Sequence, residues 1–264
     1  MDLQLKDKTV LVTGANAGIG YAIAKGFAAE GAIVYLNGRD KQKVEAAKGK
    51  IEQEIAGAKV HGVVADLGTS AGATELINQL PEVDILINNV GIFKPVSFFD
   101  ITDAEWTNMF EVNVMSGVRL SKHYMPKMLA KNWGRIIFIS SESALQIPEE
   151  MIHYGMSKTA QLSIANGLAQ LTKGTGVTVN SVLPGPTYSE GVQQFVGELA
   201  QQRNISTQEM EQVFFAEARP LSLLQRFITP DEVAATVVFT ASPLAAATNG
   251  AAVKAEGGIL KALN

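Results

Sequence analysis

The stretch TVLVTGANAGIGYAIAKGFAAEG (9–31) decides the fold. It opens with a run of Val and Leu, continues with glycines at Gly14, Gly18 and Gly20, and ends in a helical pattern. Glycines at such a turn let backbone N–H groups approach a pyrophosphate, whose charge the helix N-terminus stabilises. A plain structural turn is the alternative, because a glycine triplet alone is a weak signal. Its position between a strand and a helix favours a nucleotide-binding loop.

Short apolar segments alternate with helical patterns along the rest of the chain. The segments rich in Val and Ile predict strands buried on both faces of a parallel sheet, at residues 8–13, 32–36, 59–64, 83–88, 135–140 and 177–183. Helical periodicity covers residues 21–30, 41–55 and about 103–131. This alternation predicts an α/β fold with a doubly wound parallel sheet of Rossmann type in three layers. No linker interrupts it, so we expect one domain over residues 1–264.

The pattern changes only over about residues 186–227, which are mostly helical and of mixed polarity. An insertion after a late strand of such a sheet lies at the carboxyl edge, where ligands bind. We therefore expect this segment to form a helical substrate lid.

The composition limits the classes of partner. A formal net charge of -4 argues against general affinity for nucleic acid or an anionic membrane. The absence of cysteine excludes disulfides and thiolate metal sites, and no metal site is expected. The N-terminus lacks a signal-peptide pattern, and no apolar run is long enough to span a membrane. We expect a cytoplasmic protein that acts on a small molecule.

Further motifs follow the glycine loop in a fixed order. They are Asp66-Leu67, NNVG (88–91), Asn113, YxxxK at 154–158 and PGPTYS (184–189). With TGANAGIG as a form of TGxxxGxG, the chain resembles the classical short-chain dehydrogenase/reductase (SDR) family over nearly its whole length. The resemblance implies an oxidoreductase that uses a nicotinamide cofactor.

Tyr154 and Lys158 lie four residues apart, on one face of a helix. A nearby ammonium, like the positive nicotinamide, is expected to lower the pKa of the tyrosine, so that it serves as a general acid or base. The resemblance assigns Ser141 to holding the substrate oxygen, Lys158 also to the nicotinamide ribose, and Asn113 to a water that relays protons. Glu142 either turns to solvent or meets a polar group of the substrate.

The end of the second predicted strand suggests which cofactor is used. Gly38 stands where an NAD-preferring member carries an acid, and the guanidinium of Arg39 would attract a 2′-phosphate. Alternatively, Arg39 is a solvated charge beside Asp40. NADP(H) is favoured over NAD(H). The resemblance implies cofactor contacts at Gly14, Asn16, Gly18, Ile19, Gly20, Arg39, Asp66, Leu67, Asn89, Val90, Gly91, Tyr154, Lys158, Pro184, Gly185, Thr187 and Ser189.

The expected reaction is hydride transfer between NADP(H) and a carbonyl or secondary alcohol, with Tyr154 as the acid or base. A 3-oxoacyl thioester reductase and a non-catalytic NADP(H)-binding redox sensor are the alternatives. Position alone suggests the pocket residues Ser143, Gln146, Pro186, Val192, Phe195, Phe214 and Phe215. The resemblance also implies a homo-oligomer, either a tetramer or a dimer.

Overall fold

A computed structural model describes residues 1–261 and contains one seven-stranded sheet within that range. All strands run parallel, in the order β3-β2-β1-β4-β5-β6-β7. Their bounds are β1 (Thr9–Val12), β2 (Ile33–Gly38), β3 (Lys59–Val64), β4 (Ile85–Asn88), β5 (Gly134–Ile139), β6 (Val177–Pro184) and β7 (Ala252–Ala255). The predicted doubly wound Rossmann-type sheet is confirmed.

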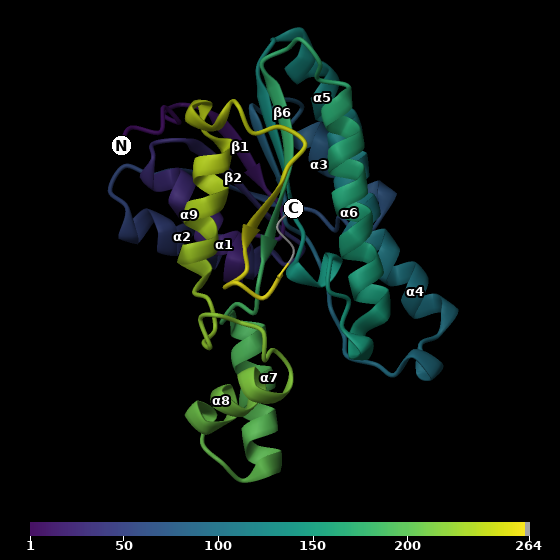
Figure 1. The fold of residues 1–264 in the computed structure, drawn as a ribbon. Helices are drawn as coiled ribbons and strands as arrows, with labels where there is room; N and C mark the ends of the chain where they lie inside the picture. Colours follow the sequence, from purple (N-terminus) through teal and green to yellow (C-terminus); the bar gives the residue numbers. More distant parts are fainter. Residues whose placement is uncertain (262–264) are drawn as a thin grey trace.

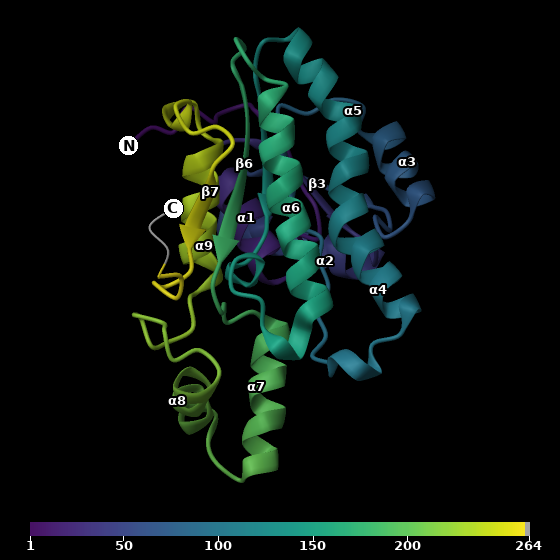
Figure 2. The same cartoon turned by 45° about the vertical axis from the view of Figure 1, so that its right-hand side comes forward.

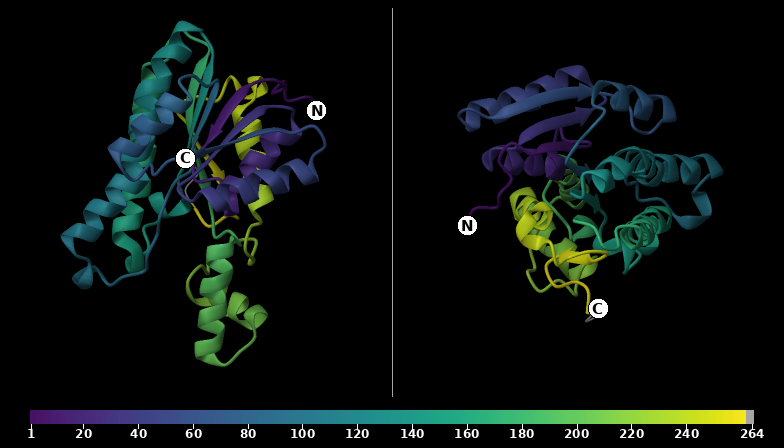
Figure 3. Two further views of the ribbon diagram at one scale, coloured as in Figure 1. Left: turned by 180° about the vertical axis from the view of Figure 1, so that it is seen from behind. Right: turned by 90° about the horizontal axis from the view of Figure 1, so that it is seen from above.

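Helices cover both faces of the sheet and make three layers (Figures 1 and 3). One face carries α1 (Gly18–Ala29), α2 (Lys41–Glu54) and α9 (Pro230–Ala241), which pack on it through one apolar cluster. The other face carries α3 (Ser70–Gln79), α5 (Ser116–Ala130) and α6 (Ile152–Gln170), which share a second cluster. Strands β4, β5 and β6 are buried at every position, because helices cover them on both sides.

The strand order reverses where β1 pairs with both β2 and β4. Val10 lies opposite Ile85 in the β1–β4 register. The connections that leave β1 and β4 therefore diverge to opposite faces, and this divergence opens a crevice at the carboxyl edge of the sheet. The glycine loop and the NNVG segment flank that crevice.

The helical segment predicted at 103–131 is not continuous. It divides into α4 (Asp103–Phe110), a π-helical turn at Glu111–Met115, and α5. Within the turn, the main-chain oxygen of Asn113 accepts a hydrogen bond from the side chain of Gln161 at 2.6 Å. Single π-helical turns inside α-helices occur frequently at functional sites.

Helices α7 (Glu190–Arg203) and α8 (Thr207–Glu217) project from the carboxyl edge of the sheet, in agreement with the helical segment predicted there (Figures 1 and 2). A left-handed residue, Asn204 (φ 54°), ends α7, and Ser206 caps α8. The helical pair has a small apolar cluster of its own, made of Val196, Ala200, Met210, Phe215 and Phe227. None of the helices described here is long and apolar enough to cross a membrane.

Candidate active site

Ser141, Tyr154 and Lys158 meet at the carboxyl edge of the sheet. Ser141 follows β5, and the other two lie on the first turns of α6. All three line one cavity of about 390 Å³. The same cavity is lined by the predicted cofactor residues Ile19, Asn89, Gly91, Pro184, Gly185, Thr187 and Ser189.

Lys158 is held by main-chain groups around the end of β5. Its ammonium donates to the carbonyl oxygen of Ile139 at 2.9 Å, and Ser140 Oγ donates to the main-chain oxygen of Lys158 at 2.9 Å. Burial lowers the pKa of Lys158 to about 8, although the charge of Glu142 acts in the opposite direction. The side chain therefore has a fixed position and a proton that it releases near neutral pH.

Tyr154 differs from the expectation that its pKa is lowered. In the protein alone, burial and then the negative charge of Glu142 raise the pKa of the phenol above its ordinary value. A hydrogen bond with Ser141 and the positive charge of Arg219 lower it. Lys158 Nζ lies 5.6 Å from the centre of the Tyr154 ring. At this separation, the ammonium does not offset the loss of hydration.

Ser141 is surrounded by hydrogen-bonding groups. Its Oγ donates to Glu142 Oε2 at 2.5 Å and accepts from the main-chain N–H of Ser143 at 3.1 Å. The second bond caps the 3₁₀ turn Glu142–Ala144, which directs the chain away from β5. The hydroxyl is thus fixed at the cavity wall.

Asn113 lies behind the cavity and is fully buried. Its Oδ1 accepts from the main-chain N–H of Ile92 at 2.8 Å, and its Nδ2 donates to Ser157 Oγ at 2.9 Å. Gln161 donates to the main-chain oxygen of Asn113, and its Oε1 lies 3.4 Å from Lys158 Nζ. Gln161 therefore bridges Asn113 and Lys158. Gln161 was not among the residues predicted from the sequence, although its position one helical turn after Lys158 was a usable signal.

The glycine loop has the geometry that its sequence suggested. Gly14 (φ 60°) and Gly18 (φ 57°) adopt left-handed backbone conformations. A Cβ at Gly20 would lie 2.4 Å from the carbonyl oxygen of Gly14, so this contact excludes a side chain. Asn89 Nδ2 donates to the carbonyl oxygens of Thr13 and Gly14, at 2.8 and 3.0 Å. The end of β4 thereby fixes the loop that follows β1.

The N-terminus of α1 has no side-chain cap. Its N-cap residue, Ala17, cannot accept a hydrogen bond through its methyl group. In contrast, side chains cap α2, α3, α4, α8 and α9. A helix end with free N–H groups beside glycines fits the phosphates of a dinucleotide, which can accept those hydrogen bonds.

The residues predicted near the adenosine lie at the end of β2 and after β3. Arg39 is exposed, and no ion-pair partner of it is found within residues 1–261. Asp40 accepts a hydrogen bond from the N–H of Lys43 as the cap of α2. Asp66 is exposed, whereas the side chain of Leu67 is packed in the core. Leu67 can therefore offer a cofactor only its main chain.

Asn16 and Val90 lie beside the glycine loop. Cβ atoms built at Gly38 and Gly14 would come within 3.0 Å of Asn16 Oδ1 and 3.1 Å of Val90 Cγ2, respectively. Both residues thus border the predicted cofactor crevice.

Most of the predicted pocket residues line the cavity, but two do not. Ser143, Pro186, Val192, Phe195 and Phe214 are found there. Phe215 is only 1% exposed and belongs to the apolar cluster of the helical pair, since it lies on the face where α8 meets α7. Gln146 lines a neighbouring cavity of about 510 Å³.

The side chain of Glu142 is not turned to solvent, and it already has an ion-pair partner in the protein. It is 5% exposed, and its Oε1 lies 3.4 Å from Arg219 Nε. Arg219 follows α8, so the ion pair joins the helical pair to the turn that carries Ser141. Arg219 was not predicted from the sequence, because no local signal links a residue after α8 to one after β5.

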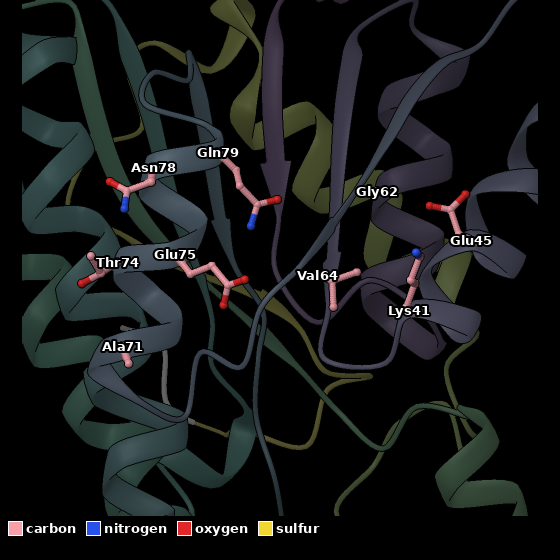
Figure 4. A pocket seen from close by; sticks show the side chains of 9 residues that line it. All are labelled: Lys41, Glu45, Gly62, Val64, Ala71, Thr74, Glu75, Asn78 and Gln79. Atoms are coloured by element: carbon pink, nitrogen blue, oxygen red, sulfur yellow. The ribbon is translucent and has the colours of Figure 1, made fainter.

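A larger cavity, of about 930 Å³, lies elsewhere. Lys41 and Glu45 of α2 and Thr74, Glu75, Asn78 and Gln79 of α3 line it, on either side of Val64 (Figure 4). None of the predicted site residues contributes to it. The smaller cavity, with the acid–base groups, is therefore the candidate active site.

Comparison with known proteins agrees with this geometry. The family model for short chain dehydrogenases matches residues 8–199. The oxidoreductase YvaG of Bacillus subtilis (strain 168) is 49% identical over 263 residues, which cover 100% of both chains. D-beta-hydroxybutyrate dehydrogenase of Cupriavidus necator is 32% identical, covering 96% of this chain and 98% of that one.

Among solved structures, L-sorbose reductase from Gluconobacter frateurii, complexed with NADPH and L-sorbose, has a TM-score of 0.94. It is 29% identical, and the match covers 100% of each chain. The sheet order, the glycine loop and the matched sequence lead to one conclusion: the chain belongs to the classical short-chain dehydrogenase/reductase family and is an oxidoreductase.

Proposed function

We propose that the protein interconverts a carbonyl compound and a secondary alcohol with NADP(H), and that Tyr154 is the general acid and base. The observation that carries this proposal is the meeting of Ser141, Tyr154 and Lys158 in a cavity that also borders the glycine loop. A redox sensor without turnover would not need these three groups together.

The bound nicotinamide supplies the hydride for the carbonyl carbon in the reduction. Tyr154 donates its phenolic proton to the carbonyl oxygen, so the two-electron reduction is balanced by one proton. Ser141 positions that oxygen by a hydrogen bond. Lys158 stabilises the resulting phenolate by its charge, and Gln161 holds Lys158 by accepting one hydrogen bond from its ammonium. In the oxidation, the phenolate accepts the proton of the alcohol.

Arg39 and Gly38 support NADP(H) as the cofactor. The exposed guanidinium is free of ion-pair partners within the part of the chain that the structure describes, and Gly38 brings no carboxylate. A 2′-phosphate would find a cation at Arg39 and no carboxylate at the Gly38 position. The structural neighbour in complex with NADPH also supports this choice.

The charges in the cavity favour an uncharged substrate. Arg203 makes two hydrogen bonds to Glu217, at 3.0 and 2.9 Å, and Arg219 is paired with Glu142. Both arginines that line the cavity are therefore already neutralised by carboxylates. Phe93, Val192, Phe195 and Phe214 supply an apolar wall. A neutral ketone with an apolar or hydroxylated chain fits this lining better than a keto acid does.

The test is a panel of neutral ketones, ketoses, keto acids and 3-oxoacyl thioesters, assayed with NADPH and NADH through the loss of cofactor absorbance. We expect turnover of neutral ketones with NADPH. Tyr154→Phe should lower kcat about a thousandfold, because it removes the general acid, while NADPH binding, followed by fluorescence, should persist. Tight NADPH binding without turnover of any compound would instead indicate a sensor, and preferred turnover of thioesters would indicate an acyl reductase.

A further inference from the structure

Glu142 and Arg219 form an ion pair that is largely buried. The exposed fractions of the two side chains are 7% and 12%. An unpaired charge is costly to bury, so each of these groups depends on its partner. The pair connects the turn after β5 with the end of the helical pair, two elements that are distant in the sequence.

The ion pair also separates two cavities. Glu142, Glu150, Glu217, Ala218 and Arg219 line both the catalytic cavity and the neighbouring cavity that contains Gln146. Arg219 NH1 lies 3.6 Å from Glu150 Oε1, just before α6, and the guanidinium lies 5.8 Å from the ring centre of Phe214. Arg219 is thus enclosed between the scaffold and the helical pair.

The hydroxyl proton of Ser141 is donated to Glu142, while Tyr154 lines the same cavity as Ser141. A serine has one proton to donate. Glu142 Oε2 lies 2.5 Å from Ser141 Oγ, so the bond to Glu142 holds that proton. A carboxylate without a cation would retain the proton more strongly than a carboxylate whose charge is balanced. The state of Glu142 therefore decides how readily Ser141 donates to Tyr154 or to a substrate oxygen.

We propose that Glu142 and Arg219 are a positioning pair: Arg219 neutralises Glu142 when the helical pair lies against the site, and this frees the Ser141 hydroxyl to support the reaction at Tyr154. The inference rests on the proposed function. It couples the placement of the helical pair to the acid–base chemistry, because the cation that balances Glu142 comes from the helical pair.

The charged groups around Tyr154 give the sign of the expected effect. Lys158 lies on its own helix, Glu142 on the turn after β5, Arg219 after α8, and Glu150 before α6. Arg203 and Glu217, across the cavity, balance each other. Glu142 raises the pKa of Tyr154 and Arg219 lowers it. Removing Glu142 should therefore lower the pKa of Tyr154, whereas removing Arg219 should raise it.

The experiment is the pH dependence of kcat for alcohol oxidation with NADP⁺, which rises as Tyr154 loses its proton. Compared with the wild type, Arg219→Met should move the rising limb up by about one pH unit, and Glu142→Gln should move it down by a similar amount. In the double variant, the two opposed shifts should largely cancel, so its rising limb should lie between those of the single variants. Arg219→Lys keeps the positive charge, so its rising limb should lie at the same pH as that of the wild type.

Controls separate this pair from simple damage. Arg226→Met removes an exposed arginine that pairs with Glu232 at 2.7 Å, and it should leave the limb in place. Thermal unfolding checks that each variant is folded; if Arg219→Met is not, Glu142→Gln and Arg219→Lys carry the test. The inference would be overturned if the rising limbs of Arg219→Met and Glu142→Gln coincided with that of the wild type, or if both moved in the same direction. Failure of the wild type to oxidise any alcohol would overturn the proposed function instead.

Discussion

The edge of the sheet and the helical pair are built in different ways. Ser140, Lys158 and Asn113 take part in hydrogen bonds that connect β5, α6 and the π-helical turn. The helical pair instead packs around five buried side chains of its own. Its connections to the sheet side include the ion pair Arg219–Glu142 and the bridge between Thr187 and Ile228.

This difference suggests a division of work. The reacting groups lie on a rigid unit, whose geometry many long-range contacts determine. The helical pair supplies an apolar wall and can be altered without changing those contacts. Changes at the sheet edge should therefore alter kcat or overall stability, whereas changes to the apolar side chains of the helical pair should alter KM for the carbonyl substrate.

The largest effect should come from truncating one buried phenylalanine in each region. Phe138→Ala in β5 and Phe215→Ala in α8 each remove a side chain that is 1% exposed, at a cost of about 3–5 kcal/mol. In urea denaturation, Phe138→Ala should lower the global free energy of unfolding by that amount. Phe215→Ala should mainly accelerate hydrogen exchange in α7 and α8 and raise KM. An equal global loss for both variants would show that the two regions unfold as one unit.

Lys158→Met should stabilise the protein while abolishing its activity. Burial lowers the pKa of Lys158 from 10.5 to about 8, so the unfolded chain binds more protons than the folded one between these values. Stability therefore rises with pH across this window, and the charged lysine costs stability below it. The variant should gain up to about 3 kcal/mol at neutral pH, and the gain should fade by a pH of about 10.5.

The measurement for Lys158→Met is the free energy of unfolding against pH. Lys173→Met, at an exposed position after α6, is the matched control and should show no such dependence. Equal free energies of unfolding for Lys158→Met and the wild type at all pH values would mean that burying the Lys158 ammonium costs no stability.

Gln161→Leu should weaken catalysis with little effect on substrate binding. It leaves Lys158 and the main-chain oxygen of Asn113 each without one hydrogen-bond partner, at a cost of about 1–3 kcal/mol. Steady-state kinetics should show kcat about tenfold lower and KM for the carbonyl nearly unchanged. Gln170→Leu, at the exposed end of the same helix, is the control. A larger change in KM than in kcat would contradict the assignment of Gln161 to the scaffold.

Arg39→Ala should have the smallest effect and should be confined to the cofactor. Losing a charge-assisted hydrogen bond should raise KM for NADPH about tenfold, with little change for NADH. KM for the carbonyl should stay constant, since Arg39 lies at the end of β2. Lys43→Ala, at another exposed cation in the first turn of α2, is the comparison. An equal change for both cofactors would remove Arg39 from 2′-phosphate recognition.

Local signals explain which features could be predicted. The glycine loop, the strands and the Tyr154–Lys158 spacing each depend on residues that are close in sequence. The π-helical turn could not be separated from an α-helix by periodicity, because its five residues shift the pattern only slightly. Arg219 was inaccessible to such reasoning because its partner lies after β5. Phe215 was misplaced because the face that α8 presents to the cavity depends on how α7 packs against it.

The uncapped start of α1 affects how stable the folded protein is in the absence of a nucleotide. A side-chain cap contributes about 1 kcal/mol to a helix, and Ala17 does not provide it. A dinucleotide that accepts those N–H bonds would complete the first helix, and mass action would make the folded population depend on the free nucleotide concentration. We therefore expect the lifetime of this chain against proteases to follow the nucleotide supply, so that abundance and catalysis decline together when the cofactor is scarce.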